Sequence, residues 1–102
     1  MIRVSVLYAN EDGATFDHDY YANKHIPMVR KKLEPGGLKK AEVDKGLAGG
    51  DGGAPPYLAV AHLFFDSVEA FQGAFGPNAE EIMGDIPNYT NLQPQVQVSE
   101  VV

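Results

Sequence analysis

The sequence predicts an α+β fold whose elements follow one another in the order β-α-β-β-α-β. Residues 2–9 and 95–102 alternate in side-chain character, which is the period of a half-buried strand. Residues 57–65 are continuously apolar, which is typical of a strand covered on both faces. Apolar residues recur three or four positions apart in the segments 17–33 and 68–75, and this spacing predicts two amphipathic helices.

Length and composition narrow the class of protein. A chain of 102 residues predicts a single domain, residues 1–102. The net charge is −6 and the eight Lys and Arg residues form no strong cluster, so we expect no nucleic-acid partner. The chain has no cysteine, which excludes disulfides and thiolate chemistry and fits a cytoplasmic protein. No signal-type leader is visible, and no segment has the roughly 18–20 apolar residues of a membrane helix.

The first half of the chain supplies two strands around a helix. After the strand 2–9 and a turn at 10–14, Asp17 suits the N-cap of a helix, with Phe16 and Tyr21 placed for a hydrophobic staple. The helix is expected to run to about Leu33, because the sequence Glu-Pro-Gly-Gly at 34–37 stops it. A polar strand over 38–49 and a glycine-rich loop over 49–56 follow.

The second half repeats this strand–helix–strand pattern. After the strand 57–65, Ser67 or Asp66 caps a helix that Gly76 and Pro77 interrupt, with another helical turn or two at 78–83. Residues 85–94 read as a loop before the last strand, 95–102. This order is the split βαβ arrangement, a four-stranded antiparallel sheet with both helices on one face.

The apolar third strand also predicts an oligomer. The two helices cover only one face of the sheet, and a chain of this length has nothing left to cover the other. A second copy is the simplest cover, so we expect a homodimer with sheet face against sheet face. The contact face is expected to include some of Val4, Val6, Tyr8, Leu63 and Phe65, but alternation alone leaves open which set of side chains faces which layer.

The segment 16–29, FDHDYYANKHIPMV, raises the question of function. One stripe of the first helix contains His18, Tyr21, Ala22, His25, Val29 and Leu33, so His25 is expected to point toward the sheet. Pro27 has no amide hydrogen and disfavours helical angles at Ile26, which predicts a kink or reset at residues 25–27 with a gap beside His25.

Three interpretations of His25 are open. The first is a core histidine bonded to a backbone carbonyl, and the second is a metal ligand. The third is a proton-transfer group that acts with Tyr21, which lies four residues earlier on the same helix face. His18 and His25 are separated by about 10.5 Å along a helix and cannot share one ion, although His62 could approach either of them and Asp44 could add a carboxylate. No HExxH-type spacing supports a metal, so we predict none.

Several stretches together resemble the EthD family, named for ethyl tert-butyl ether degradation. They are MIRVSVLYAN, FDHDYYANKHIPMV, VDKGLAGG, APPYLAVAHLFFDSVEAFQGAFGP and EIMGDIPNYTNLQPQVQVSEV, and they span nearly the whole chain. The most specific part is Tyr21 with His25-Ile26-Pro27. The resemblance implies a dimeric α+β barrel, in which two ferredoxin-like subunits pack their sheets together.

The resemblance also implies a site. Small hydrophobic ligands of related proteins bind between the sheet and the helices, and a histidine at the place of His25 lines that cleft in some members. The implied catalytic residues are His25 and Tyr21, and we expect Tyr8, His62, Val29 and Phe71 to contact the ligand. No cofactor is expected; haem is possible only by analogy with other members of the superfamily. The activity stays open between cofactor-free proton transfer and an accessory, ligand-binding role beside a monooxygenase.

Overall fold

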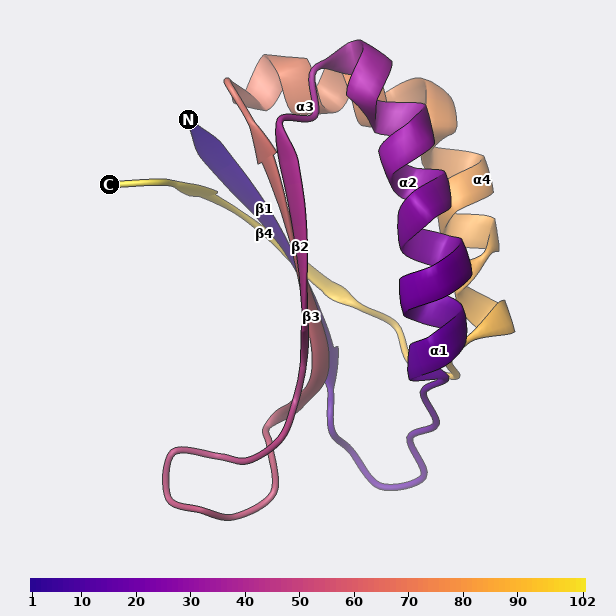
Figure 1. The fold of residues 1–102 in the computed structure, drawn as a ribbon, viewed down its shortest axis with the longest axis vertical. Helices are drawn as coiled ribbons and strands as arrows, with labels where there is room; N and C mark the ends of the chain where they lie inside the picture. The colour runs from indigo at the N-terminus through magenta and orange to yellow at the C-terminus, as the bar shows by residue number, and fades with distance from the viewer.

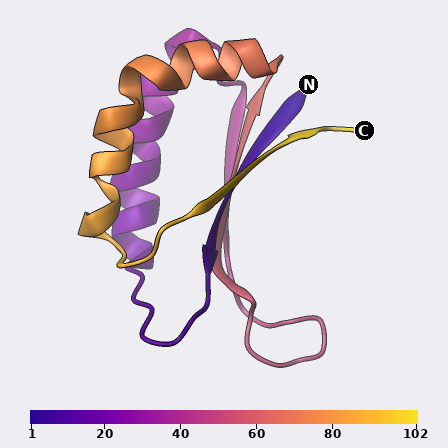
Figure 2. The same cartoon turned by 180° about the vertical axis from the view of Figure 1, so that it is seen from behind.

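The four strands form one antiparallel sheet with all the helices on one face (Figure 1), in a computed structural model that describes residues 1–102. The strand order is β2-β3-β1-β4. The strands are β1 (Ile2–Ala9), β2 (Lys40–Lys45), β3 (Tyr57–Phe65) and β4 (Gln95–Glu100). Seen from behind in Figure 2, the sheet again has helices on one side only, and the β2–β3 loop extends away from both layers. The predicted α+β fold, ferredoxin-like with the order β-α-β-β-α-β, is confirmed.

Two strands are shorter than the sequence predicts. β1 and β3 have the predicted bounds, but β2 spans residues 40–45 instead of 38–49, and β4 ends at Glu100 instead of 102. A strand needs a hydrogen-bonding neighbour, and the β2–β3 pairing ends where Lys45 faces Ala59. Beyond that point the glycine-rich segment forms a loop.

The first helical segment changes its hydrogen-bond pattern rather than breaking. It consists of α1 (His18–Tyr20), the π-helical turn η1 (Tyr21–His25), α2 (Ile26–Leu33) and the 3₁₀ turn η2 (Glu34–Gly36). Asp17 caps it by accepting the amide hydrogen of Tyr20 at 3.0 Å, and Gly37, at φ 117°, ends it in the left-handed region.

The predicted reset occurs one turn earlier than expected. Ile26 keeps helical angles, φ −63° and ψ −42°, so the expectation that Pro27 would displace it was wrong. Instead the amide of Ile26 donates to the carbonyl of Tyr21, five residues back. This shift places Pro27, which has no amide hydrogen, at the start of α2, where no donor is needed. The wider turn also leaves Ala22 exposed, although the helical stripe placed it inside.

The second helical segment is interrupted as predicted. It contains α3 (Val68–Phe75), η3 (Gly76–Asn78), α4 (Ala79–Gly84) and a further turn, η4 (Ile86–Asn88), in the predicted loop. Ser67, not Asp66, is the cap, and its hydroxyl accepts the amide hydrogen of Ala70 at 3.1 Å. No helix in the structure combines the length and hydropathy that crossing a membrane requires.

The register decides which side chains face the helices. Val4 pairs with Leu63 on one side and with Val98 on the other, and directly opposed residues share a face. The helix-facing side chains of β1 and β3 build two buried clusters. One cluster is centred on Val4, Leu33 and Phe65, and the other on Tyr8, Tyr21 and Tyr89.

The open face of the sheet differs from the face that the sequence suggested. The prediction that the dimer contact uses residues of one alternation set was wrong, because that whole set lies under the helices. The set consists of Val4, Val6, Tyr8, Leu63 and Phe65. The opposite set faces away from the helices and is partly exposed; it includes Ser5, Leu7, Val60, His62 and Phe64. Alternating side chains of a strand point to opposite faces of the sheet, and only the position of the helices determines which face is covered.

Candidate active site

A cavity of about 170 Å³ lies between the sheet and the helices, where the two buried clusters meet. Of its 17 lining residues, 15 are hydrophobic, so it is suited to an apolar ligand. Two lining residues are well exposed, Met83 of α4 at 47% and Val96 of β4 at 55%, and they place its opening between α4 and β4. The lining includes five of the residues that the sequence predicted: Tyr8, Tyr21, His25, Val29 and Phe71.

His25 brings a polar ring into this apolar wall. The π turn directs it toward the sheet, and only 4% of the residue is exposed. Its Nδ1 lies 2.8 Å from Oδ2 of Asp85, which precedes η4 in the second half of the chain. A buried imidazole on a π turn, paired with a carboxylate at a cavity wall, is an arrangement more typical of a functional site than of a packed core.

Asp85 is held as a carboxylate by three donors. Besides His25, the hydroxyl of Tyr20 donates to its Oδ1 at 2.7 Å and the side-chain amide of Asn88 at 2.9 Å. Partial burial by itself would raise the pKa of Asp85, but the hydrogen bonds from Asn88, His25 and Tyr20 outweigh it and lower that pKa. The site therefore contains a fixed negative charge at neutral pH.

The protonation of His25 follows from these partners. Burial lowers the pKa of the imidazole, and the bond to Asp85 offsets only part of that effect. The neutral ring has one hydrogen, and because a carboxylate only accepts, that hydrogen sits on Nδ1. Nε2 then carries a lone pair and no hydrogen, which is the state that a general base requires.

Two phenols continue the network from Nε2. The hydroxyl of Tyr89 lies 3.4 Å from Nε2 of His25 and 2.5 Å from the hydroxyl of Tyr8. Since Nε2 accepts, Tyr89 donates to it, and Tyr8 in turn donates to Tyr89. Burial raises the pKa of both phenols, so both stay protonated. The chain of hydrogen bonds ends at Tyr8, which lines the cavity.

Tyr21 contacts His25 by stacking. The two ring centroids are 5.4 Å apart and the planes are nearly parallel at 14°. Its packing against Phe16, at 5.0 Å, confirms the predicted hydrophobic staple. Burial raises the pKa of the Tyr21 hydroxyl, so this residue presents a neutral phenol to the cavity. The ring fixes the plane of the imidazole, and the hydrogen-bond partners of His25 are Asp85 and Tyr89.

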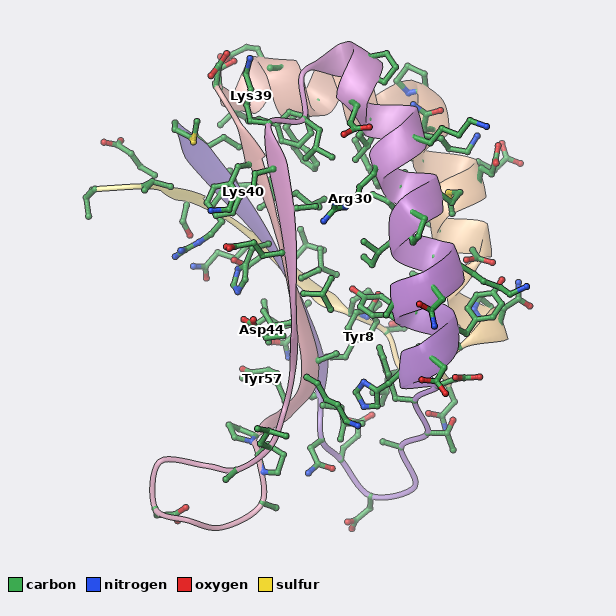
Figure 3. All side chains as sticks on the ribbon, in the orientation of Figure 1. Tyr8, Arg30, Lys39, Lys40, Asp44 and Tyr57 are labelled. Atoms are coloured by element: carbon green, nitrogen blue, oxygen red, sulfur yellow. The ribbon has the colours of Figure 1, made fainter.

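His62, which the sequence prediction placed beside the ligand, lies away from this site and does not line the cavity. It belongs to the open-face set of β3, where Nδ1 lies 3.2 Å from Oγ of Ser5 and Nε2 lies 3.2 Å from Oδ2 of Asp44. Figure 3 shows Asp44 directed away from the helices, whereas Tyr8 points into the space between the layers. His18 is partly exposed and packs its ring against Phe16 at 4.7 Å, so the three histidines stay apart.

The structure contains no grouping of three or more His, Cys, Asp or Glu side chains that could hold a metal ion. His62 has Asp44 and Ser5 as neighbours, and His25 has one carboxylate and a phenol. Neither set offers the three protein ligands of a catalytic zinc site. The side chains of the site offer an imidazole, phenols and a carboxylate.

Sequence reasoning missed the partners of His25. Asp85 and Tyr89 lie 60 and 64 residues further along the chain. The only local signal is the sequence Asp-Ile-Pro-Asn at 85–88, which indicates a turn and says nothing about a partner. Their role depends on α4 and η4 packing beside α2, which is a tertiary contact.

Comparison with known proteins adds the family. The family model described as the EthD domain matches residues 12–93. This chain belongs to the EthD family. An EthD-like protein from Ralstonia eutropha JMP134 is 43% identical, with 99% of this chain and 91% of that chain covered and a TM-score of 0.92. Among the curated proteins, none matches.

More distant structures share the fold. An ethyl tert-butyl ether (EthD) family protein from Bacillus halodurans C-125 is 19% identical, with a TM-score of 0.71 over 100% of this chain and 99% of that chain. A dimeric ferredoxin-like protein from an uncultured marine organism is 10% identical, with a TM-score of 0.56 over 100% of this chain and 95% of that chain. The EthD chain therefore has a ferredoxin-like fold that also occurs in a dimeric protein.

Proposed function

We propose that this EthD protein binds a small hydrophobic or aromatic intermediate of a degradation pathway in the cavity, and that His25 moves a proton on it without a cofactor. The observation that carries the proposal is the Asp85–His25 pair at 2.8 Å, with the imidazole on the cavity wall. An apolar cavity supplies binding energy, and a few polar groups at one end orient the ligand.

The reaction is an isomerase-like or lyase-like proton transfer. Nε2 of His25 gives up its long hydrogen bond from Tyr89, at 3.4 Å, and takes a proton from an acidic C–H or O–H group of the ligand, and the electron pair of that bond stays on the ligand. Asp85 stabilises the resulting imidazolium through its hydrogen bond to Nδ1. In an isomerisation the proton then returns to a different atom of the ligand. In a lyase-like elimination that electron pair forms a double bond, and the group on the neighbouring atom leaves with its own bonding pair and accepts the proton from His25. Neither path consumes an oxidant or a reductant. Tyr21 orients the imidazole by stacking and Tyr8 reaches the ligand from the cavity wall.

A second candidate function is that of an accessory protein without turnover. It would hold the same kind of ligand for a monooxygenase, and His25 would only fix it by a hydrogen bond. The scarcity of polar groups favours this candidate, because 15 of the 17 lining residues are hydrophobic. The family description of the Bacillus halodurans relative, which refers to ethyl tert-butyl ether, fits a small and weakly polar ligand.

We also propose a homodimer through the open face of the sheet. Leu7, Val60 and Phe64 are partly exposed on that face, although strands of this composition are usually covered on both sides. A second copy would bury them, and one structure with the same fold is described as dimeric. His62 and Asp44 would then lie at the dimer contact instead of at the ligand.

Native mass spectrometry of gently purified protein beside His25→Ala tests the binding and the dimer together. The proposal expects a mass of two chains in both samples. It also expects an additional organic mass on the wild type that the variant loses. A monomer in both samples would refute the dimer, and an organic mass kept by the variant would remove His25 from the site.

Incubation of the captured compound with fresh protein separates the two candidate functions. A catalytic His25 predicts chemical conversion of the compound and a loss of about 10²–10⁴-fold in rate in His25→Ala. Compound that returns unchanged from the wild type would support the accessory function and refute the proton-transfer function.

A further inference from the structure

The size of the cavity limits the ligand. Its volume is about 170 Å³, and an engineered apolar cavity of about 150 Å³ in another protein holds benzene. Aromatic and branched side chains from both layers surround this space, among them Phe71, Leu63 and Ile82. A single ring or a compact branched skeleton fills it, whereas two fused rings need more room.

The polar groups of the cavity are gathered on three residues. Tyr8, Tyr21 and His25 are the lining residues with side-chain nitrogen or oxygen atoms. They lie together, since Tyr21 contacts both other rings at centroid distances of 5.6 and 5.4 Å. A ligand with one oxygen atom can place it there and leave the rest of its skeleton in the apolar part. Polar groups elsewhere on the ligand would be buried without partners.

No positive charge is available to a bound anion. The lining contains no Lys or Arg. Nearby cations have other partners, because Arg30 donates to the carbonyl of Ala41 at 2.8 Å and Lys32 pairs with Glu81 at 2.7 Å. If His25 becomes protonated, Asp85 already supplies its counter-charge. A carboxylate in the cavity would be a buried and uncompensated charge.

The geometry points to an uncharged ligand of roughly six to ten non-hydrogen atoms, with one ring or a branched skeleton and a single oxygen at the Tyr8–Tyr21–His25 end. This inference rests on the proposed function, whose site it specifies. It excludes carboxylic acids as the bound species and so narrows the substrate to alcohols, phenols, ethers and ketones of this size.

A calorimetric titration at pH 8 with three probes tests the inference. Acetophenone and benzoate have nearly the same shape and differ in charge, and 2-acetylnaphthalene adds one ring. We expect acetophenone to bind, benzoate to bind at least about 100-fold more weakly, and the two-ring ketone to bind more weakly than acetophenone. This comparison uses the wild-type protein and does not depend on a variant.

Two variants locate the binding. Ala61 lines the cavity and is buried, so Ala61→Leu should fill the space and abolish acetophenone binding. Ala22→Leu makes the same change on the exposed helix surface and should leave binding intact. Acetophenone binding that survives Ala61→Leu would overturn the assignment to this cavity.

The outcomes separate the inference from the function beneath it. Benzoate that binds as tightly as acetophenone would overturn the charge argument, and tighter binding of 2-acetylnaphthalene would overturn the size argument. Either result leaves a ligand-binding site in place. A complete lack of binding by all three probes would overturn the proposed function itself.

Discussion

Replacing Asp85 by Asn should change the tautomer of His25 while leaving the fold in place. The carboxylate accepts from His25, Tyr20 and Asn88 at 2.8, 2.7 and 2.9 Å. An amide has one acceptor oxygen and one donor group, so one side of it must face a donor. The donor-against-donor contact is removed if the hydrogen of His25 moves from Nδ1 to Nε2, because Nδ1 can then accept a hydrogen bond from the new amide. Nε2 then has no lone pair for proton transfer.

The cost in stability can be worked from the same bonds. Hydrogen bonds to charged groups contribute about 1.5–3 kcal/mol and neutral ones about 0.5–1.5 kcal/mol, so each of the three bonds loses roughly 1 kcal/mol. The side chain of Asp85 is 17% exposed, and solvent compensates part of the loss. We expect a destabilisation of about 2 kcal/mol. For a domain of this size, each kcal/mol lowers Tm by roughly 4–8 °C.

Nitrogen NMR of the histidine rings and a thermal melt measure both effects. In the wild type the His25 signals should show hydrogen on Nδ1, and in Asp85→Asn they should show hydrogen on Nε2. Asp66→Asn is the matched control, because Asp66 forms an exposed surface pair with Lys39 at 3.4 Å and should cost less than about 1 kcal/mol. An unchanged His25 tautomer together with an unchanged Tm in Asp85→Asn would refute the reasoning.

Two further predictions concern stability. Burial lowers the pKa of His25 below its ordinary value of 6.5, so the unfolded chain binds more protons between the folded-state pKa and 6.5. The free energy of unfolding should therefore fall as pH drops below 6.5. Urea titrations at a series of pH values should show a smaller fall in His25→Gln than in the wild type. An equal fall in both proteins would contradict the contribution assigned to His25. A Cβ on Gly36 would lie 2.5 Å from Cβ of Ala74, so Gly36→Ala should destabilise by about 1–3 kcal/mol. Gly73→Ala, where a Cβ meets nothing within 4 Å, should instead stabilise helix α3 by about 0.5–1 kcal/mol. Chemical denaturation of the two variants measures both changes in the free energy of unfolding. Equal changes in the two variants would count against the close contact between residue 36 and Ala74.

Features that neighbouring residues control could be predicted from the sequence alone. The bounds of β1 followed from side-chain alternation and those of β3 from a continuous apolar run, and the cap at Asp17 followed from local hydrogen bonding within one turn. The disturbance at Pro27 was also local, since a missing amide hydrogen affects only the adjacent turns. The inward direction of His25 followed from helical spacing, and the structure confirms its burial.

The partners of His25 depend on contacts between distant parts of the chain. Its bond to Asp85 joins residues 60 positions apart, and no local pattern encodes the packing of η4 beside the first helix. The face of His62 was equally undetermined, because alternation gives two sets of side chains without saying which set the helices cover. Long-range packing of the two helical segments onto one face of the sheet resolved both questions, by placing Asp85 beside His25 and leaving His62 on the opposite side.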